Sequence, residues 1–488
     1  MGIISDKKFF STKYSTLFIA IFFFIVNFVL KIIYLDSMDI ANDEPFTIFW
    51  AQVGLHELMQ KLNTGNNAPF HFFLMHFWVK LFGINPFSVR FLSLIFSSVT
   101  PVFIFLIGKR FYNYFTGILA AFIFTFATIH VYFSHEARVY SLLALLTAIS
   151  LYLFLRIIEN PKNRKLFIFL FIVNLLLIYS HYFGFFIPFI EVISVLFIKE
   201  RKSLIKPITL LMSFLAISFL PIFFIFIERF SSSTNNGTWV SGPEFGQVYG
   251  FLNIFINNRI NMLLLILIFI TGFIIVLKQK YFKKTFDDLF NTKTVIIFLW
   301  FFVPYIIMFL ISYKVPMFID RYILYTSIPF YIFIAILVNS VFQNYRFKII
   351  AAVIFLGSMV FTFSLNPDNF RNMKEIVALV KRLKTKNTEV FIAPDYADLG
   401  FVYHYNIDYF KDYKNYKQLM KSENIFPVSN EAEAASVLDT TLNKCIYIQA
   451  GSEFQDPDNK IYNFLSSKYK KVEHHKVFQV YLVHDFSN

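Results

Sequence analysis

The stretch "YSTLFIAIFFFIVNFVLKIIYL", residues 14–35, decides the fold class of this chain. It is long enough to cross a bilayer, which takes about 20 predominantly apolar residues, and Lys31 is its only charged residue. Apolar residues make up 57% of the 488-residue chain, including 69 Phe, which is more than a soluble protein of this size buries. The sequence therefore predicts a mostly α, polytopic membrane protein with about eleven transmembrane helices, at 14–35, 87–108, 114–133, 139–158, 166–180, 183–198, 205–228, 260–277, 294–312, 321–341 and 347–365.

The distribution of charge supports this arrangement and argues against a nucleic-acid partner. Residues 366–488 hold 16 basic and 16 acidic residues, so the whole net charge of +14 falls within residues 1–365. There, Lys and Arg gather in alternate connecting segments, such as 162–165 and 199–202, as expected of cytoplasmic loops. Lys7, Lys8 and Lys13 before the first span predict an uncleaved anchor with a cytoplasmic N-terminus.

Two domains are expected. Residues 1–365 form the transmembrane domain, with a long first outer loop at 36–86, and residues 366–488 form a small soluble α/β domain on the extracytoplasmic side. In that second part "MKEIVALVKRL" has helical spacing, whereas "TEVFIAP", "NKCIYIQAG" and "VFQVYLVHD" each resemble one strand. In the first outer loop, "PFTIFWAQVGLHELMQ" and "PFHFFLMHFWVKLFG" predict two helices.

An acidic pair opens the first of those loop helices. Asp43 and Glu44 stand directly before Pro45, which is a common helix start in which carboxylates cap free N–H groups. The same pair lies at the membrane edge of a long outer loop, where partial desolvation makes a carboxylate more basic. Asp43 and Glu44 are therefore candidate catalytic residues, one as general base and its neighbour in an orienting role.

Two arginines follow acids at the outer ends of spans. Glu136 and Arg138 lie in "FSHEARVYSL", and Asp320 and Arg321 lie in "MFIDRYILY". In each case the acid and the arginine could form an internal ion pair that links helix ends. Alternatively, because guanidinium geometry matches phosphate oxygens, Arg138 and Arg321 could bind a phosphate.

Other ionisable residues give weaker signals. His71 and His181 are more often hydrogen-bonded interface residues than metal ligands, and no spacing typical of a protein metal site occurs. Glu191, within the sixth predicted span, is a functional candidate without a nameable partner. Cys445 is the only cysteine, so no disulfide framework is expected.

Taken in order, these segments resemble one family. Asp43 and Glu44, "APFHFFLMHFWVKLFGINPFSVRFLSLIFS", "SHEARVYSLLALLTAISLYLFLR", "SHYFGFF" and "PMFIDRYIL" are similar to the motifs of the membrane-embedded C-type glycosyltransferases. The chain resembles the branch of protein O-mannosyltransferases and the aminoarabinose transferase of lipid A, and it looks most like their bacterial family 39 relatives. This chain departs from their frequent Pro-Pro at Ala68 and Pro69, and "NTGNNAP" supplies amides instead of further acids, which leaves acceptor handling and a divalent cation open.

The resemblance implies an inverting transfer of a sugar from a polyprenyl phosphate to an acceptor hydroxyl on the extracytoplasmic face. Asp43 would be the base, Glu44 would support the loop or the acceptor, and Arg138 and Arg321 would bind the donor phosphate. The donor or acceptor groove would draw on further residues, namely Glu136, His181, Tyr182, His71 and Asp320. The acceptor would be a protein, lipid A or a cell-surface glycan. Low Gly with many Phe, Ile, Asn and Lys is typical of a bacterium with an AT-rich genome, so the expected location is a bacterial inner membrane.

Three other functions remain open at this point. A lipid-linked sugar flippase or transporter usually shows matched halves and Gly- or Pro-broken spans around a midplane site. This sequence shows no matched halves, an odd number of predicted spans, and polar groups at the outer rim. A surface-polysaccharide polymerase or ligase would use a diphosphate-linked glycan. A non-catalytic scaffold would tolerate substitution of Asp43, Arg138 and Arg321.

Overall fold

A computed structural model describes residues 13–236, 240–278, 282–367, 371–439, 441–452, 455–478 and 481–488, so Lys7 and Lys8 lie outside the described residues. The chain divides into two compact units. Unit 1 contains residues up to Leu35, Met59–His71 and Arg90–Pro367, and unit 2 contains Asp36–Leu58, Phe72–Val89 and Asp368–Asn488. Residues 368–488 thus share a compact unit with parts of the first outer loop, a grouping that the sequence alone did not indicate.

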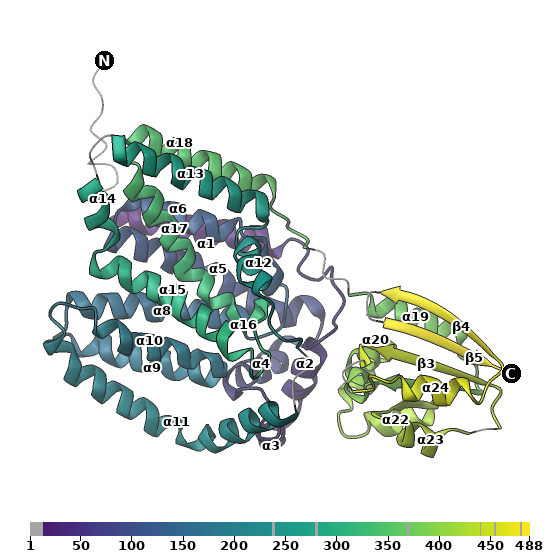
Figure 1. Cartoon of the computed structure of the whole chain (residues 1–488). Coiled ribbons are helices and arrows are strands. Elements are labelled where there is room, and N and C mark those ends of the chain that lie inside the picture. The colour runs from purple at the N-terminus through teal and green to yellow at the C-terminus, as the bar shows by residue number, and fades with distance from the viewer. Residues whose placement is uncertain are drawn as a thin grey trace. The chain divides into compact units, whose positions relative to one another are not determined.

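Unit 1 is a bundle of apolar helices. Helices α8 and α9, α6 and α17, and α15 and α17 pack against one another, and Figure 1 shows them side by side. Its helices are α1 (Lys13–Ile32), α6 (Tyr114–Thr125), α7 (Thr128–Ser134), α8 (Tyr140–Glu159), α9 (Arg164–Ser180), η1 (Tyr182–Phe185), α10 (Phe186–Val195), α11 (Lys202–Asn236), α12 (Phe245–Phe255), α13 (Arg259–Lys278), α14 (Phe282–Leu289), α15 (Thr292–Ile311), α16 (Asp320–Ile323), η2 (Leu324–Thr326), α17 (Ser327–Val341) and α18 (Tyr345–Phe361). Helices α3 (Leu55–Asn63), α4 (Pro69–Phe82) and α5 (Pro86–Phe111) run across the boundary between the units.

The polytopic fold predicted from the sequence is confirmed, whereas the number of eleven spans is not. Among the described residues, seven helices are long and apolar enough to cross a membrane, or eight if the bent pair α6–α7, with a 59° bend, counts as one span. The remaining predicted spans coincide with α9, α10 and α18, which are helical and apolar but have at most 17 residues each. At 1.5 Å per residue, such helices cover less than the ~30 Å hydrocarbon core.

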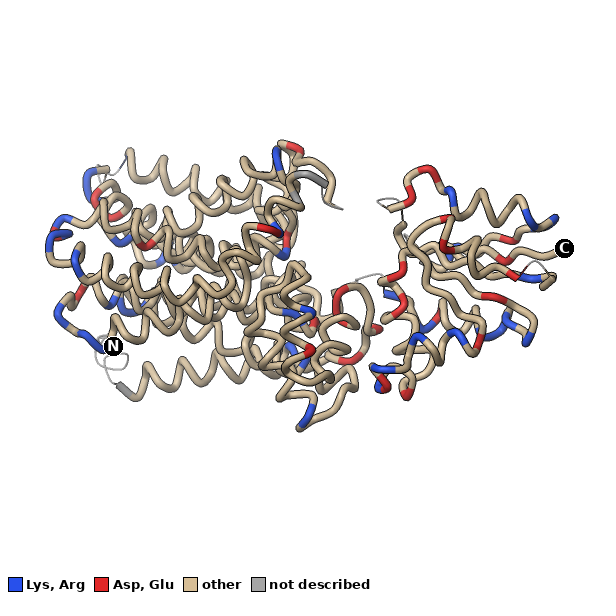
Figure 2. The backbone as a smooth tube through the Cα atoms, turned by 90° about the horizontal axis from the view of Figure 1, so that it is seen from below, with Lys and Arg blue, Asp and Glu red and all other residues tan. Residues whose placement is uncertain are grey.

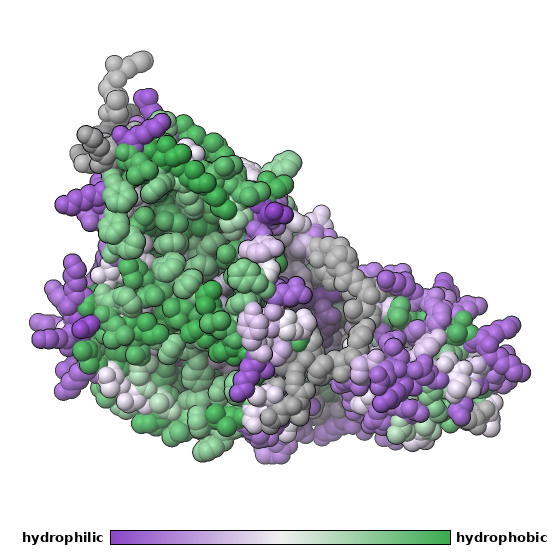
Figure 3. All heavy atoms as spheres, in the orientation of Figure 1, coloured by the Kyte–Doolittle hydropathy of each residue, from purple (hydrophilic) through white to green (hydrophobic). Residues whose placement is uncertain are grey.

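The packing of unit 1 separates core helices from peripheral ones. In the apolar window of residues 320–341, 83% of residues are buried, against 22% in α1 and in α11. Figure 3 shows the resulting hydrophobic surface over the bundle, which suits a lipid environment. Lys and Arg of the bundle gather mainly at one end (blue in Figure 2).

Two buried ionisable side chains inside the bundle, Glu191 and Lys31, are hydrogen-bonded. Glu191 accepts from Ser150 Oγ and Asn174 Nδ2, each at 2.7 Å, so the structure supplies the partners that the sequence could not name. Lys31 donates to Asn27 Oδ1 and Ser97 Oγ, each at 2.9 Å. Such pairing is what permits ionisable groups inside a helix bundle.

Unit 2 contains helix α2 (Glu44–Gln52) of the first outer loop and a five-stranded sheet with the order β2-β1-β3-β5-β4. Strands β2 (Ile425–Pro427), β1 (Thr388–Ala393) and β3 (Lys444–Ala450) are parallel, whereas β5 (Tyr481–Ser487) is antiparallel to β3 and to β4 (Lys471–Phe478). Its other helices are α19 (Met373–Leu383), η3 (Asp395–Ala397), α20 (Asp398–Tyr405), α21 (Ile407–Lys411), α22 (Tyr416–Ser422), α23 (Glu431–Val437) and α24 (Lys460–Ser466).

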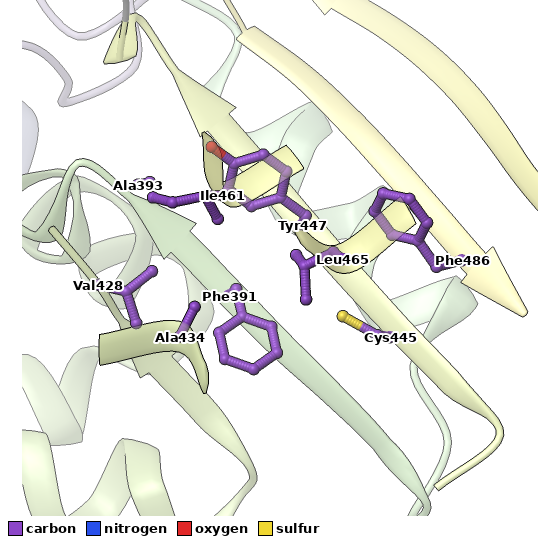
Figure 4. Close-up of a cluster of buried hydrophobic side chains, with 9 residues drawn as sticks. All are labelled: Phe391, Ala393, Val428, Ala434, Cys445, Tyr447, Ile461, Leu465 and Phe486. Carbon is purple, nitrogen blue, oxygen red and sulfur yellow. The ribbon is translucent and has the colours of Figure 1, made fainter. Parts of the chain in front are cut away.

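The sheet is held by an apolar cluster that includes Phe391, Tyr447, Phe486 and the buried Cys445 (Figure 4). Three of the expected elements match α19, β1 and β3. The prediction of one strand for "VFQVYLVHD" is wrong, because Phe478 pairs with Tyr481 and the segment joins two antiparallel strands. The prediction of one helix for 45–60 is also wrong, since Val53 ends α2 with an extended backbone before α3 begins.

Candidate functional site

Two groups of candidate residues are described separately, a cationic one in unit 1 and an acidic one in unit 2. Arg138 lies in the turn between α7 and α8, where its backbone N–H donates to the carbonyl of Glu136 at 2.8 Å. Its carbonyl accepts from Ser93 Oγ at 3.3 Å, and its guanidinium donates to Asn67 Oδ1 at 3.3 Å. Arg138 is therefore fixed before the start of α8 by its own turn, by α5 and by the amide-rich segment of the first loop.

His181 brings the second arginine to the same place. It occupies the turn between α9 and η1, with its ring centroid 6.3 Å from Tyr140 and 5.5 Å from Tyr322. A Cβ at Gly184 would collide with the carbonyl group of Leu177, so this turn needs glycine. Arg321 is the second residue of α16 and lies over the Tyr322 ring, 5.5 Å from its centroid. Tyr140 and Tyr322 thus place His181 between the elements that carry Arg138 and Arg321.

The electrostatics agree with this placement. Burial, together with the positive charges of Arg138 and Arg321, lowers the pKa of His181 to about 3. Burial likewise lowers the pKa of His71 to about 3, with Arg138 contributing. Imidazoles held neutral in this way are weaker bases than an ordinary carboxylate. The predicted residues Arg138, Arg321, His181 and His71 are therefore neighbours, and the two histidines suit hydrogen bonding better than proton abstraction.

An apolar groove of about 800 Å³ lies next to this cluster. Tyr182 and Met317, two of its lining residues, follow His181 and precede Arg321 closely in the chain. The lining is otherwise aromatic and aliphatic, from Phe183, Phe185, Phe186, Pro188, Phe189, Val192, Met212, Leu215, Ala216, Phe219, Leu220, Phe223, Phe226, Phe230, Ile307, Met308 and Ile311. The groove therefore has a lining that suits a hydrocarbon chain.

The acidic part begins at Asp43. Asp43 is the N-cap residue of α2, but its side chain does not cap the helix, so the capping role considered from the sequence is wrong for this carboxylate. Its carbonyl accepts from the backbone N–H of Thr47 at 3.3 Å. The carboxylates of Asp395 and Asp43 both contribute, after burial, to raising the pKa of Tyr396. Asp43 is half-buried beside η3 of the C-terminal sheet domain.

Glu44 has a different environment. Its Oε2 lies 2.7 Å from Arg371 Nη1, and each of these two side chains exposes only 1% of its surface. Tyr481 is close to this pair, since Arg371 opposes the rise of the Tyr481 pKa to about 12 that burial causes. No motif or spacing in the sequence pointed to Arg371 or Tyr396, because each reaches the acidic pair only through folding of residues more than 300 positions away.

The remaining predicted residues have mixed surroundings. Glu136 is buried, and its carbonyl holds the Arg138 backbone. Asp320 Oδ1 accepts from the Arg321 backbone N–H at 2.7 Å, as a residue that begins a helix does. Among the described residues no group of three or more His, Cys, Asp or Glu could hold a metal ion, so no residue is assigned to a cation.

Comparison with known proteins adds a sequence match and a fold. Residues 66–225 match the profile of a family described as dolichyl-phosphate-mannose-protein mannosyltransferase. ArnT from Cupriavidus metallidurans in the apo state is similar in structure, with a TM-score of 0.59 and 10% sequence identity over 97% of this chain and 98% of ArnT. ArnT bound to undecaprenyl phosphate gives the same TM-score and identity over 96% of this chain and 98% of ArnT.

A second kind of protein shares the architecture. The archaeal oligosaccharyltransferase AglB from Archaeoglobus fulgidus, in complex with an inhibitory peptide and a dolichol-phosphate, has a TM-score of 0.56 and 10% identity over 97% of this chain and 75% of that protein. No protein of curated function matches this chain in sequence. The matched segment 66–225 contains His71, Arg138, His181 and Tyr182.

Proposed function

We propose that this chain, a membrane-embedded C-type glycosyltransferase by its fold and by the sequence of residues 66–225, moves a sugar from a polyprenyl phosphate to an acceptor hydroxyl with inversion at the anomeric carbon. The acceptor is a protein, lipid A or a cell-surface glycan. In this proposal the donor lipid and the acceptor are the protein's partners, along with the surrounding membrane lipids.

One observation carries the proposal: the apolar groove adjoins the turn at His181, and the positive charges of Arg138 and Arg321 both act on the His181 ring. A polyprenyl phosphate has the matching chemistry, because its tail is pure hydrocarbon and its head is an anion. Each buried CH₂ contributes about 0.8 kcal/mol, so the tail supplies affinity. The guanidinium groups bind phosphate oxygens and neutralise charge on them.

The reaction then requires only a base and a stabilised leaving group. The acceptor oxygen attacks the anomeric carbon, the bond from that carbon to the phosphate oxygen breaks, and polyprenyl phosphate leaves. Asp43 accepts the proton of the acceptor hydroxyl. Arg138 and Arg321 stabilise the charge that builds up on the phosphate, which is usually the largest contribution in such reactions. His71, His181 and Tyr182 line the donor side, and Glu136 and Asp320 hold the backbone of the two arginines.

The chemistry is proposed to take place on the extracytoplasmic side of a bacterial inner membrane. Arg138 precedes α8, and at the other end of that helix Glu159 pairs with Arg110 at 2.9 Å and Lys293 at 3.3 Å. The basic end of the bundle in Figure 2 is the one expected in the cytoplasm. Arg138 therefore belongs to the opposite end.

Transfer by the purified protein in detergent tests this function. Polyprenyl-phosphate sugars are offered with protein, lipid A and glycan acceptors, and the products are identified by mass spectrometry. Glycosylated acceptor without a sealed membrane is the expected result and excludes pure transport. Turnover of polyprenyl diphosphate glycans alone would instead indicate a polymerase or ligase. Transfer that shows no preference for polyprenyl-phosphate sugars would overturn the proposal.

The groove makes a separate prediction. Ala216 lines it from α11, so Ala216→Trp fills space that the donor tail needs. We expect the KM for the full-length polyprenyl donor to rise about tenfold, since an occluded tail loses a few buried methylene groups. A donor with a short, water-soluble tail should keep its KM.

Ile217 offers a matched control for that variant. It is the next residue of α11, exposes 62% of its surface and does not line the groove. Ile217→Trp should therefore leave the KM for both donors unchanged. Equal KM values for Ala216→Trp and the parent with the long donor would show that the tail lies elsewhere.

A further inference from the structure

The segment that carries Asp43 is held by the C-terminal domain at three places within six residues. Lys374 donates its backbone N–H to Asp39 Oδ2 at 2.8 Å, and its ammonium lies 3.1 Å from Asp39 Oδ1. His404 Nε2 donates to the carbonyl of Ile40 at 2.8 Å. Arg371 donates to Glu44 at 2.7 Å. These contacts bracket Asp43 on both sides.

Apolar packing continues the attachment along α2. The Phe49 ring makes edge contacts with Phe410 and Tyr416, at centroid distances of 5.4 and 4.9 Å. Pro45 approaches Gly400, where a Cβ would lie 3.6 Å from the proline ring. The first two turns of α2 therefore lie on helices α20 to α22 of the C-terminal domain, in one compact unit.

The contact next to Asp43 differs from the others in its burial. Glu44 and Arg371 are both 1% exposed, whereas Lys374 exposes 62% of its side chain. A buried ion pair adds little net stability compared with apolar residues of similar size, because both charges lose their hydration. An exposed pair is also worth little and holds its side chains loosely. The buried pair tolerates only a narrow range of side-chain positions, because displacement of either partner would leave a buried charge without its counter-charge.

The local backbone transmits that geometry to Asp43. Asn42 has a positive φ of 56°, and Asp43 then adopts φ −84° and ψ −11° before Glu44 begins α2. With the following residue fixed through its side chain and Ile40 fixed through its carbonyl, few backbone arrangements remain for Asp43. The backbone position from which its carboxylate projects is accordingly restricted.

We propose that Arg371 is a positioning residue, which holds Asp43 in its reactive orientation through the ion pair with Glu44. This inference rests on the proposed function, in which Asp43 is the base. It assigns different roles to the two adjacent carboxylates, since Asp43 accepts the proton and Glu44 forms the ion pair with Arg371. It also makes the C-terminal domain a part of the catalytic apparatus, in addition to any role in acceptor binding.

Kinetics of full-length variants in detergent test this inference. Arg371→Met should lower kcat about 10- to 100-fold with both KM values within about twofold of the parent, because a small misplacement of a reacting group costs this much. Glu44→Gln should lower kcat about as much as Arg371→Met does, because it leaves the buried guanidinium without its counter-charge, and far less than loss of the base at Asp43 does. Lys374→Met, which removes the exposed ammonium beside Asp39, is the matched control and should behave as the parent.

A merely structural role predicts a different pattern. In that case the folded fraction falls, measured by size-exclusion chromatography and thermal melting, while kcat per folded molecule stays at the parent value. If Arg371→Met does not fold, Arg371→Lys keeps a positive charge at the pair in a different geometry. We expect it to melt near the parent temperature with kcat about tenfold lower.

The inference is overturned if folded Arg371→Met or Arg371→Lys has the parent kcat. It is also overturned if Glu44→Gln loses as much as Asp43→Asn, because Glu44 would then take part in proton transfer. Failure of the proposed function looks different. An active Asp43→Asn variant refutes the base itself, whatever Arg371 does.

Discussion

Asp43→Asn is expected to abolish sugar transfer, with kcat lowered by about 10³-fold, which is the range in which a general base contributes. The amide is nearly isosteric with the carboxylate and cannot accept the acceptor proton. Because the Asp43 side chain does not cap α2, its replacement removes no helix cap, and the variant should fold and melt as the parent does. Initial rates at saturating donor and acceptor measure the effect.

Asp39→Asn is the matched control for this prediction. Asp39 lies in the same loop, and its amide could still accept from the backbone N–H of Lys374. Its kcat should stay within about threefold of the parent, since the Lys374 side chain of this ion pair is 62% exposed and such a pair contributes little. Parent-level transfer by Asp43→Asn would rule out the base assigned here and, with it, the mechanism.

Loss of either guanidinium group should be nearly as severe. Arg138→Met and Arg321→Met are each expected to lower kcat by about 10²- to 10³-fold, as removal of one donor to a developing oxyanion does. Binding gives a second readout. Polyprenyl phosphate, the leaving product, should inhibit the parent enzyme and should inhibit both variants less.

Arg156→Met controls for loss of a guanidinium group in the same region of sequence. Arg156 lies near the other end of α8, where it donates to Tyr152 Oη at 3.1 Å. Its removal should change neither kcat nor product inhibition. If Arg138→Met and Arg321→Met were inhibited by polyprenyl phosphate as strongly as the parent, the two arginines would not bind the phosphate, and the groove would need another occupant.

Glu191 illustrates how structure changes the interpretation of a sequence signal. An acid within an apolar span is a functional candidate by default. Here Ser150 of α8 and Asn174 of α9 both donate to its carboxyl group. The arrangement joins three helices, which accounts for Glu191 without assigning it to the reaction.

The sequence by itself determined the class of the protein and its principal candidates. Membrane segments can be recognised in a sequence because a bilayer requires runs of apolar residues of a set length and tolerates charge mainly at their ends. Asp43, Arg138 and Arg321 stood out for the same reason, as charged residues at the outer ends of those runs. Glu44 stood out as well, but nothing in its neighbours distinguished an acid that takes a proton from one that receives an ion pair.

Only the tertiary structure decided which residues meet. His181 lies near both Arg138 and Arg321 because aromatic rings from two helices, α8 and α16, pack against it. Arg371 reaches Glu44 across 327 positions of the chain, and no local pattern encodes a contact of that kind. Periodicity and composition indicate whether a segment faces lipid, water or the protein interior. The partner of a buried charge, in contrast, is set by packing between segments distant in sequence.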